Sequence, residues 1–174
     1  VRAELGIPTV FNILGPLSHP GRLTRQVIGV ADPATADLMV QVLANNGSTD
    51  AIVVTGDREL DEFSLTGPSR MLHLADGAVT ERQVDPTDLG LATATEADLA
   101  GGDAATNAAI AAGIFAGTDT GPRRDIVALN AAAGLVVAGV AADRAEGVER
   151  SLQVLAEGAP ATKLAELIAA TRGD

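Results

Sequence analysis

The sequence contains no cysteine, tryptophan or tyrosine, and only three phenylalanines. Without cysteine the chain has no disulfides, no thiolate metal site and no cysteine nucleophile, which is compatible with a cytosolic protein. The shortage of aromatic rings disfavours nucleic-acid binding by base stacking. Basic side chains are also scarce, with 12 against 23 acidic ones and a formal net charge of −11. Because that charge repels phosphate backbones, we expect no nucleic-acid partner.

The chain also lacks an apolar run long enough to cross a bilayer, and no signal peptide opens it. We therefore expect no membrane partner. What it does have is 47% hydrophobic residues over 174 positions, enough for a globular domain with a substantial core. It begins with Val1 rather than Met, in a pattern typical of a helix interior. We therefore expect a segment of a longer protein.

The first half of the chain predicts a strand, a helix and a second strand. Apolar runs at residues 26–30 and 51–54 are typical of buried strands. Between them, Asp32 followed by proline is a typical helix start, which predicts a helix from 33 to about 44. Strand, helix and strand in this order indicate a βαβ unit with parallel strands.

After this unit, two apolar runs flank Asp76-Gly77, which predicts a β-hairpin over residues 71–84. The longest apolar segment contains Asn130, whose amide needs a buried partner. Thr95 is interpreted as the cap of a short turn through Leu99. Further helices are expected at residues 104–116, 126–142, 143–157 and 161–172. The fold class is therefore α/β, with a central, mostly parallel sheet flanked by helices.

Two adjacent carboxylates, Asp61 and Glu62, follow the predicted strand 51–54 and a glycine turn at Gly56. In open α/β sheets ligands bind where strands end. Neighbouring carboxylates repel each other, and a hard cation relieves that cost. Magnesium in particular is held by one or two carboxylates, with water and phosphate oxygens at its remaining positions. The residues alone also fit, more simply, a solvated acidic turn.

The other motifs have simpler, structural interpretations. Gly15-Pro16 ends an apolar run, where a helix terminator is the simpler interpretation and a close backbone approach the alternative. A lone loop histidine, His19, is given no catalytic role. Asp103 after two glycines is interpreted as a helix N-cap and not as part of a phosphate loop. No dinucleotide-binding or Walker motif is present.

Several separate stretches point to one family. These are Val-Arg-Ala-Glu-Leu-Gly-Ile-Pro-Thr-Val-Phe-Asn-Ile-Leu-Gly-Pro-Leu-Ser-His-Pro at 1–20, Leu-Asp-Glu-Phe-Ser at 60–64, Gly-Gly-Asp at 101–103, and Leu-Asn-Ala-Ala-Ala at 129–133. In this order they closely resemble the C-terminal α/β portion of the anthranilate phosphoribosyltransferase family, over residues 1–174. The fold implied is that of the nucleoside phosphorylase and phosphoribosyltransferase catalytic domains. The helical N-terminal domain and the first strands are expected to precede Val1.

The resemblance implies transfer of the phosphoribosyl group from phosphoribosyl pyrophosphate to anthranilate, in tryptophan biosynthesis in the cytoplasm. It also implies a magnesium cofactor and a homodimeric parent protein. Asp61 and Glu62 correspond to the magnesium ligands, Arg2 to the arginine that holds anthranilate, and Gly15 with Pro16 to the turn along the aromatic substrate's path. No residue is assigned as a general acid or base, and Asn12 has at most a supporting role. The departures from the family pattern are peripheral, at Pro8, His19 and Thr55.

Two alternatives stay open at this point. One is a related pyrimidine nucleoside phosphorylase, against which the Leu-Asp-Glu and Gly-Pro-Leu stretches weigh. The other is a homologue that has lost catalysis and acts by binding. Because the family's glycine-rich phosphate loop is expected upstream of Val1, we expect the 174-residue chain alone to be inactive or nearly so.

Overall fold

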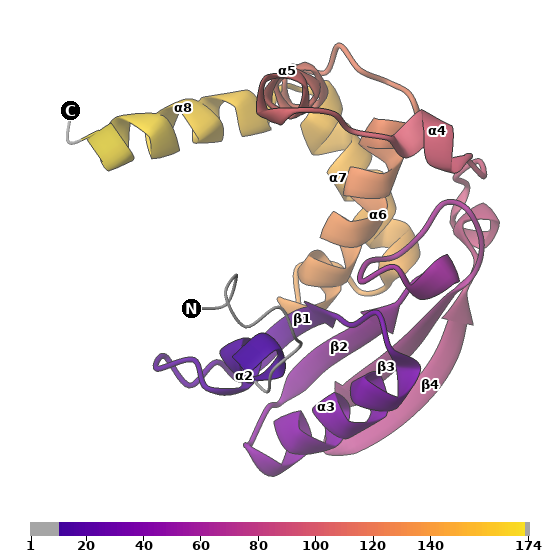
Figure 1. Ribbon diagram of the computed structural model, residues 1–174. Coiled ribbons are helices and arrows are strands. Elements are labelled where there is room, and N and C mark those ends of the chain that lie inside the picture. The colour runs from indigo at the N-terminus through magenta and orange to yellow at the C-terminus, as the bar shows by residue number, and fades with distance from the viewer. Residues whose placement is uncertain (1–10, 173–174) are drawn as a thin grey trace.

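The computed structural model describes residues 11–172, and within residues 11–13 the backbone only. The described strands form a four-stranded sheet in the order β1, β2, β3, β4. These strands are β1 (Arg25–Gly29), β2 (Asp50–Thr55), β3 (Ser69–Ala75) and β4 (Ala78–Val84). Helices cover both faces, which confirms the predicted α/β class (Figure 1).

The sheet is mixed, which corrects the expectation of a mostly parallel one. β1 and β2 are parallel, as the βαβ pattern predicts, whereas β2 with β3 and β3 with β4 are antiparallel. The hairpin explains the difference. At its turn Asp76 and Gly77 both have positive φ, 50° and 75°, as a tight two-residue turn requires. The hairpin therefore adds two strands that reverse direction, and one of the three described pairings remains parallel.

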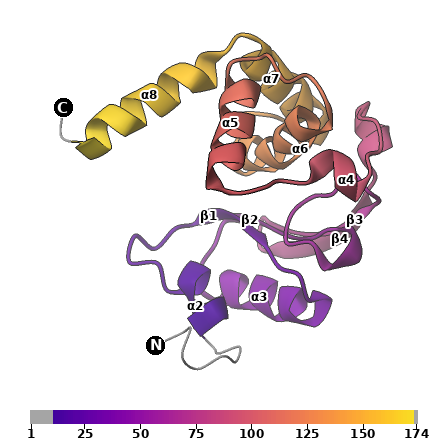
Figure 2. The ribbon, with the colours of Figure 1, turned by 45° about the horizontal axis from the view of Figure 1, so that its top comes forward.

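One face of the sheet is covered by α2 (Phe11–Leu17) and α3 (Pro33–Asn45) (Figure 2). α3 begins as predicted, because the Asp32 carboxylate accepts a hydrogen bond from the Thr35 N–H at 2.8 Å. It ends before Gly47, whose φ is +85°. The core on this side is formed by Ile28, Val30, Ala36, Met39, Val40, Leu43, Ala51, Val53, Leu72 and Leu74.

The opposite face of the sheet packs against α6 (Pro122–Val137) and α7 (Arg144–Ala156). The core here contains Ile52, Val54, Phe63, Leu65, Met71, Val84, Leu91, Leu129, Ala132, Ala133, Val137 and Val148. Small residues bring the two helices together: a Cβ added to Gly147 would lie 2.9 Å from the Ala132 Cβ. α6 begins four residues earlier and ends five residues earlier than the predicted 126–142. Pro122 opens it at a first-turn position, and it ends before Gly139, which has a φ of +72°.

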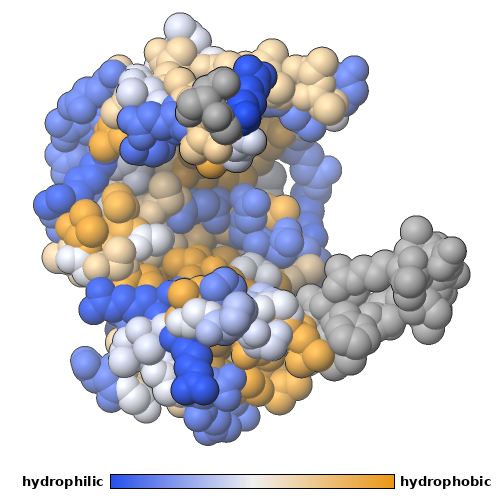
Figure 3. All heavy atoms as spheres, turned by 90° about the vertical axis from the view of Figure 1, so that its left-hand side faces the viewer, coloured by the Kyte–Doolittle hydropathy of each residue, from blue (hydrophilic) through white to orange (hydrophobic). Residues whose placement is uncertain are grey.

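The remaining α-helices are α4 (Glu96–Leu99), α5 (Ala104–Phe115) and α8 (Ala159–Arg172), and two short 3-10 helices are η1 (Asp57–Glu59) and η2 (Pro86–Leu89). Thr95 caps α4 and Asp103 caps α5, as predicted. α8 extends away from the other helices and buries none of its residues within the described chain (Figure 1). Seen from that side, the surface is hollowed between the helices and the sheet (Figure 3). Among the residues described, no helix is long and apolar enough to span a membrane.

Candidate functional site

The acidic pair, Asp61 and Glu62, lies on a tightly folded loop after β2, residues 56–64, which we call the acidic loop. The Gly56 N–H donates to the Leu60 carbonyl at 2.7 Å, which closes the loop directly beyond the strand. Within this loop Arg58 and Glu59 have φ values of 56° and 62°, in the left-handed region that disfavours side chains. Asp61 then follows at the base of the loop. The chain therefore reverses sharply and returns Asp61 and Glu62 to the ends of the strands, on a loop as predicted.

Two glycines allow this loop to lie directly on the strand ends. A Cβ built on Gly29, the last residue of β1, would lie 1.5 Å from the Asp61 carbonyl oxygen. A Cβ on Gly56 would lie 2.2 Å from the Glu62 carbonyl oxygen. Real side chains do not tolerate such distances, so only glycine permits this approach. The backbone of both acidic residues is therefore packed against the carboxyl ends of the two parallel strands, where open α/β sheets bind ligands.

The residue after the acidic pair anchors the loop to α6. Phe63 is 1% exposed and belongs to the core between the sheet and α6. Its N–H donates to the Asn130 Oδ1 at 2.8 Å, and its carbonyl accepts from the Asn130 Nδ2 at 3.0 Å. These contacts are the buried partner that the sequence predicted for Asn130. The acidic loop is thereby held from both sides, by the sheet and by α6.

Asp61 and Glu62 are exposed overall, but the Glu62 carboxyl is partly buried and the two acids are not electrostatically independent. Partial burial of the Glu62 carboxyl, and next the charge of Asp61, raise the pKa of Glu62 above its ordinary value of 4.5. Neither acid takes part in an ion pair between described residues, whereas the neighbouring Arg58 pairs with Asp57 and Glu96. Within the described chain, the pair therefore has uncompensated negative charge that a cation would stabilise.

Glu62 also lines a pocket of about 400 Å³ between the acidic loop, α4 and the start of α6. Carboxylates dominate its polar lining, with one arginine. The lining residues are Asp57, Arg58, Glu59, Leu60, Glu62, Ser64, Thr66, Glu96, Leu99, Ala100 and Ile126. No group of three or more side chains that could hold a metal occurs among the described residues. Of the acidic pair, Glu62 lines this pocket and Asp61 does not. A pair of carboxylates fits a magnesium ion that keeps water and phosphate oxygens at its other positions.

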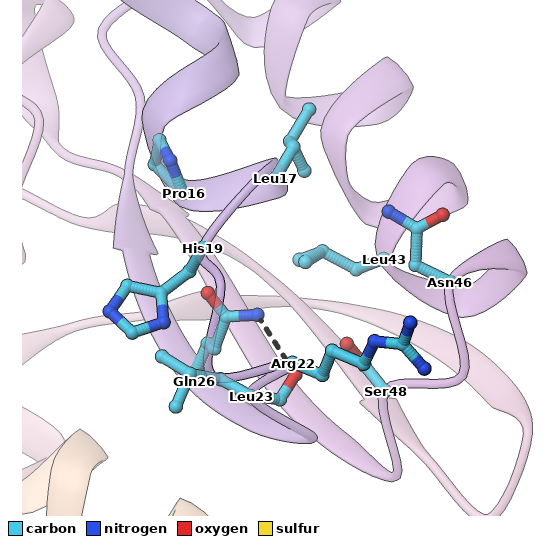
Figure 4. Close-up of a pocket in the computed structure, with 9 residues that line it drawn as sticks. All are labelled: Pro16, Leu17, His19, Arg22, Leu23, Gln26, Leu43, Asn46 and Ser48. Carbon is cyan, nitrogen blue, oxygen red and sulfur yellow. Dashed lines mark hydrogen bonds between the residues drawn. The ribbon is translucent and has the colours of Figure 1, made fainter.

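Gly15 and Pro16 lie elsewhere, in the last turn of α2, which ends one residue later at Leu17. No described atom lies within 4 Å of a Cβ built on Gly15, so the close approach considered from the sequence is not seen among the described residues. Pro16 lines a pocket of about 310 Å³ beside the start of β1 and the end of α3 (Figure 4). The acidic loop lies at the other end of β1. The structure thus places these two groups of predicted site residues at opposite ends of that strand.

Three other predicted positions can be placed only in part. Arg2 lies outside the described residues, and for Asn12 only the backbone, in α2, is described. His19 lies in the loop after α2, lines the same pocket as Pro16, and accepts a hydrogen bond from the Gly21 N–H at 3.0 Å.

The role of Gly29 was not predicted from the sequence. Its signal was present, because an isolated glycine within an apolar strand often marks a close backbone approach. Gly56 was noted as a turn residue, but its contact with the Glu62 backbone was not predicted. Both roles concern pairs of residues that only the folded chain brings together.

Comparison with known proteins decides the family. A sequence model of the glycosyl transferase family, a/b domain, matches residues 1–161. The chain belongs to this family. Among curated members similar to it are the anthranilate phosphoribosyltransferases of Roseiflexus sp. (strain RS-1), 46% identical over 99% of this chain and 51% of the relative, and of Afipia carboxidovorans, 48% identical over 98% and 50%. The chain therefore spans about half the length of the curated relatives it matches.

Solved structures of anthranilate phosphoribosyltransferases are also similar to this chain. The anthranilate phosphoribosyltransferase of Thermus thermophilus matches with a TM-score of 0.81 and 38% identity, over 90% of this chain and 46% of that one. The Saccharomyces cerevisiae enzyme in complex with PRPP and Mg matches with a TM-score of 0.78 and 28% identity, over 90% and 45%. The same yeast enzyme in complex with 4-fluoroanthranilate matches with a TM-score of 0.78 and 26% identity, over 90% and 46%.

Proposed function

We propose that this chain is the C-terminal part of the α/β domain of an anthranilate phosphoribosyltransferase. The whole protein would transfer the phosphoribosyl group from phosphoribosyl pyrophosphate to anthranilate in tryptophan biosynthesis, releasing pyrophosphate. The observation that carries this proposal is the Asp61–Glu62 pair, packed on the strand ends of a chain 46–48% identical to enzymes of that name. Cytoplasmic location and a homodimeric parent protein stay predictions.

We assign Asp61 and Glu62 as the magnesium ligands of this chain. The raised pKa of Glu62 and the lack of ion pairs among described residues support an incoming cation at this loop. The yeast relative described in complex with PRPP and Mg supports the choice of magnesium. When bound, magnesium supplies positive charge that stabilises the pyrophosphate leaving group. The two carboxylates hold and orient that charge on a loop fixed by the sheet and by α6.

The proposed anthranilate contacts come from the N-terminal stretch. A guanidinium at Arg2 can bind a carboxylate through two parallel hydrogen bonds, a geometry that lysine does not reproduce. Gly15 and Pro16 are proposed to line the path of the aromatic ring. The aromatic amine is already a nucleophile once it is correctly placed, so positioning replaces a strong general base.

The test uses a protein in which this chain follows the N-terminal half expected from its relatives. Mixed with anthranilate, phosphoribosyl pyrophosphate and magnesium, it should cause a loss of anthranilate fluorescence. The loss should require magnesium and disappear in the double variant Asp61→Asn with Glu62→Gln. A matched control is Asp76→Asn, which removes one carboxylate in the hairpin turn away from the acidic loop and should retain the reaction.

Different outcomes of this assay would overturn different parts of the proposal. No loss of fluorescence with saturating substrates would overturn the transferase assignment. Cleavage of a pyrimidine nucleoside by phosphate under the same conditions would instead indicate the related phosphorylase activity. Turnover that survives the double substitution would overturn the role of the acidic pair but not the reaction.

A further inference from the structure

Asn130 occupies a position where asparagine destabilises the protein unless its side-chain amide is fully hydrogen-bonded. It lies inside α6, and asparagine is a poor helix former because its amide competes for backbone hydrogen bonds. Here both amide donor directions are used: Nδ2 donates to the carbonyls of Phe63 and Ile126, each at 3.0 Å. Its oxygen accepts the Phe63 N–H at 2.8 Å. An apolar residue could pack at this site, but it would leave the Phe63 N–H and carbonyl without these partners.

The contact acts on the backbone of the acidic pair. The Phe63 N–H belongs to the same planar peptide unit as the Glu62 carbonyl. Asn130 holds the N–H side of that plane, and the Glu62 carbonyl lies against Gly56, where an added Cβ would come within 2.2 Å of it. The peptide plane is therefore fixed at both edges. The Cα of Glu62, and with it the origin of the carboxylate side chain, is fixed as well.

The loop needs such support. Arg58 and Glu59 both lie in the left-handed backbone region, which is unfavourable for residues with side chains and persists only where the surroundings impose it. The loop also brings the like charges of the adjacent Asp61 and Glu62 together. Contacts outside the loop must therefore select this conformation. Asn130, 67 residues away in the sequence, supplies one of them.

We propose that Asn130 is a positioning residue for the Asp61–Glu62 pair, and that it raises the affinity of this pair for a divalent cation by fixing the Glu62–Phe63 peptide. The inference rests on the magnesium role assigned above. Residues that orient metal ligands through hydrogen bonds change metal affinity by roughly tenfold to a hundredfold when they are removed. Asn130 would act at a distance from the ion, through the backbone of its ligands.

The test measures binding of Mn²⁺, as a spectroscopic probe, to the 174-residue chain by electron paramagnetic resonance. Asn130→Ala should weaken Mn²⁺ binding by about tenfold. Asn130→Gln keeps an amide of different reach and serves as the second variant if the alanine protein does not fold; it should also weaken binding. Val40→Ala is the matched control, since it destabilises the core on the α3 side of the sheet, and its Mn²⁺ affinity should stay within about twofold of the parent.

A second measurement needs no metal. Amide hydrogen exchange in metal-free protein should become faster in residues 57–64 of the Asn130 variant while β2 and β3 keep the parent rate. Unchanged exchange in that loop, or equal loss of Mn²⁺ affinity in Val40→Ala, would overturn the positioning role and leave the proposed function standing. No Mn²⁺ binding by the parent chain would overturn the assigned metal pair and this inference together.

Discussion

Gly29 and Asp61 are in backbone contact: a Cβ on Gly29 would lie 1.5 Å from the Asp61 carbonyl oxygen. Gly29 ends the strand that is parallel to β2, and Asp61 is the first of the two adjacent acids. No side chain fits between them, so the position of the acidic loop depends on the absence of one methyl group. This contact explains why β1 ends in glycine.

Gly29→Ala should therefore damage both stability and the acidic loop. Accommodating the methyl group requires a shift of the backbone, with a cost of about 1–3 kcal/mol in the free energy of unfolding. Mn²⁺ binding should fall with it. Unfolding is best followed by circular dichroism, because the chain has no tryptophan or tyrosine.

The control for this variant is Gly134→Ala in α6, where an added Cβ meets no described atom within 4 Å. In a helix interior, alanine is favoured over glycine by about 0.5–1 kcal/mol, so this variant should be more stable than the parent. If both substitutions change stability in the same direction, the close approach at Gly29 is not what decides the effect.

Glu59→Gly should stabilise the chain. Glu59 has a φ of 62°, and the left-handed region costs a residue with a side chain about 1–2 kcal/mol. Glycine removes this cost but gains about 0.5–1 kcal/mol of conformational entropy in the unfolded chain, so the net gain should be about 0.5–1 kcal/mol. Urea titration of both proteins measures the difference, and a lower midpoint for the glycine variant would contradict the expectation.

Acid should weaken the N-cap of α3. The hydroxyl and the backbone N–H of Thr35 donate to the Asp32 carboxylate and lower the pKa of Asp32 below its ordinary value of 3.8. A lowered folded pKa means that the stabilisation is present above the unfolded value and is lost as the pH falls through the folded one. Asn caps helices well without titrating. Asp32→Asn should therefore lose less thermal stability than the parent below about pH 4.

Melting temperatures of the two proteins, measured at intervals from pH 6 to about pH 2.5, check this expectation. The parent curve should fall more steeply than that of Asp32→Asn in the acidic part of the series. Parallel curves throughout would show that the charge of Asp32 has no part in the acid sensitivity of the chain.

The 174-residue chain alone should not turn over its proposed substrates. It spans only about half the length of the curated relatives that are named for this reaction. The anthranilate fluorescence assay, run beside a full-length relative as a positive control, measures this directly. Magnesium-dependent turnover by the chain alone would show that these residues are sufficient for catalysis.

Local signals account for the parts of the fold that the sequence predicted well. Asp32 and Thr95 were predicted as helix caps, and each accepts the expected backbone hydrogen bond. Asp76-Gly77 makes the hairpin turn because both residues adopt positive φ. Each of these features depends on residues within a few positions of one another. The acidic loop was predicted for the same reason, since it directly follows a strand.

The mixed sheet was harder to predict. The hairpin was recognised, but the pairing of its first strand with β2 was not predicted. Strand order depends on which exposed edge a later strand pairs with, and apolar alternation along the strand carries no such information. The position of Pro16, at the opposite end of β1 from the acidic loop, likewise depends on how α2 packs beside α3.

The strands, the helix caps, the hairpin turn and the acidic pair could be predicted from the sequence, because backbone conformation and hydrogen bonding between near neighbours specify them. The contact of Gly29 with Asp61 and the hydrogen bonds of Asn130 to Phe63 could not, because they depend on how the folded chain packs. These contacts join residues 32 and 67 positions apart, and they form only when the sheet and α6 pack on a shared core. The residues proposed to bind the cation can therefore be recognised in the sequence, whereas their positions are fixed only in the folded protein.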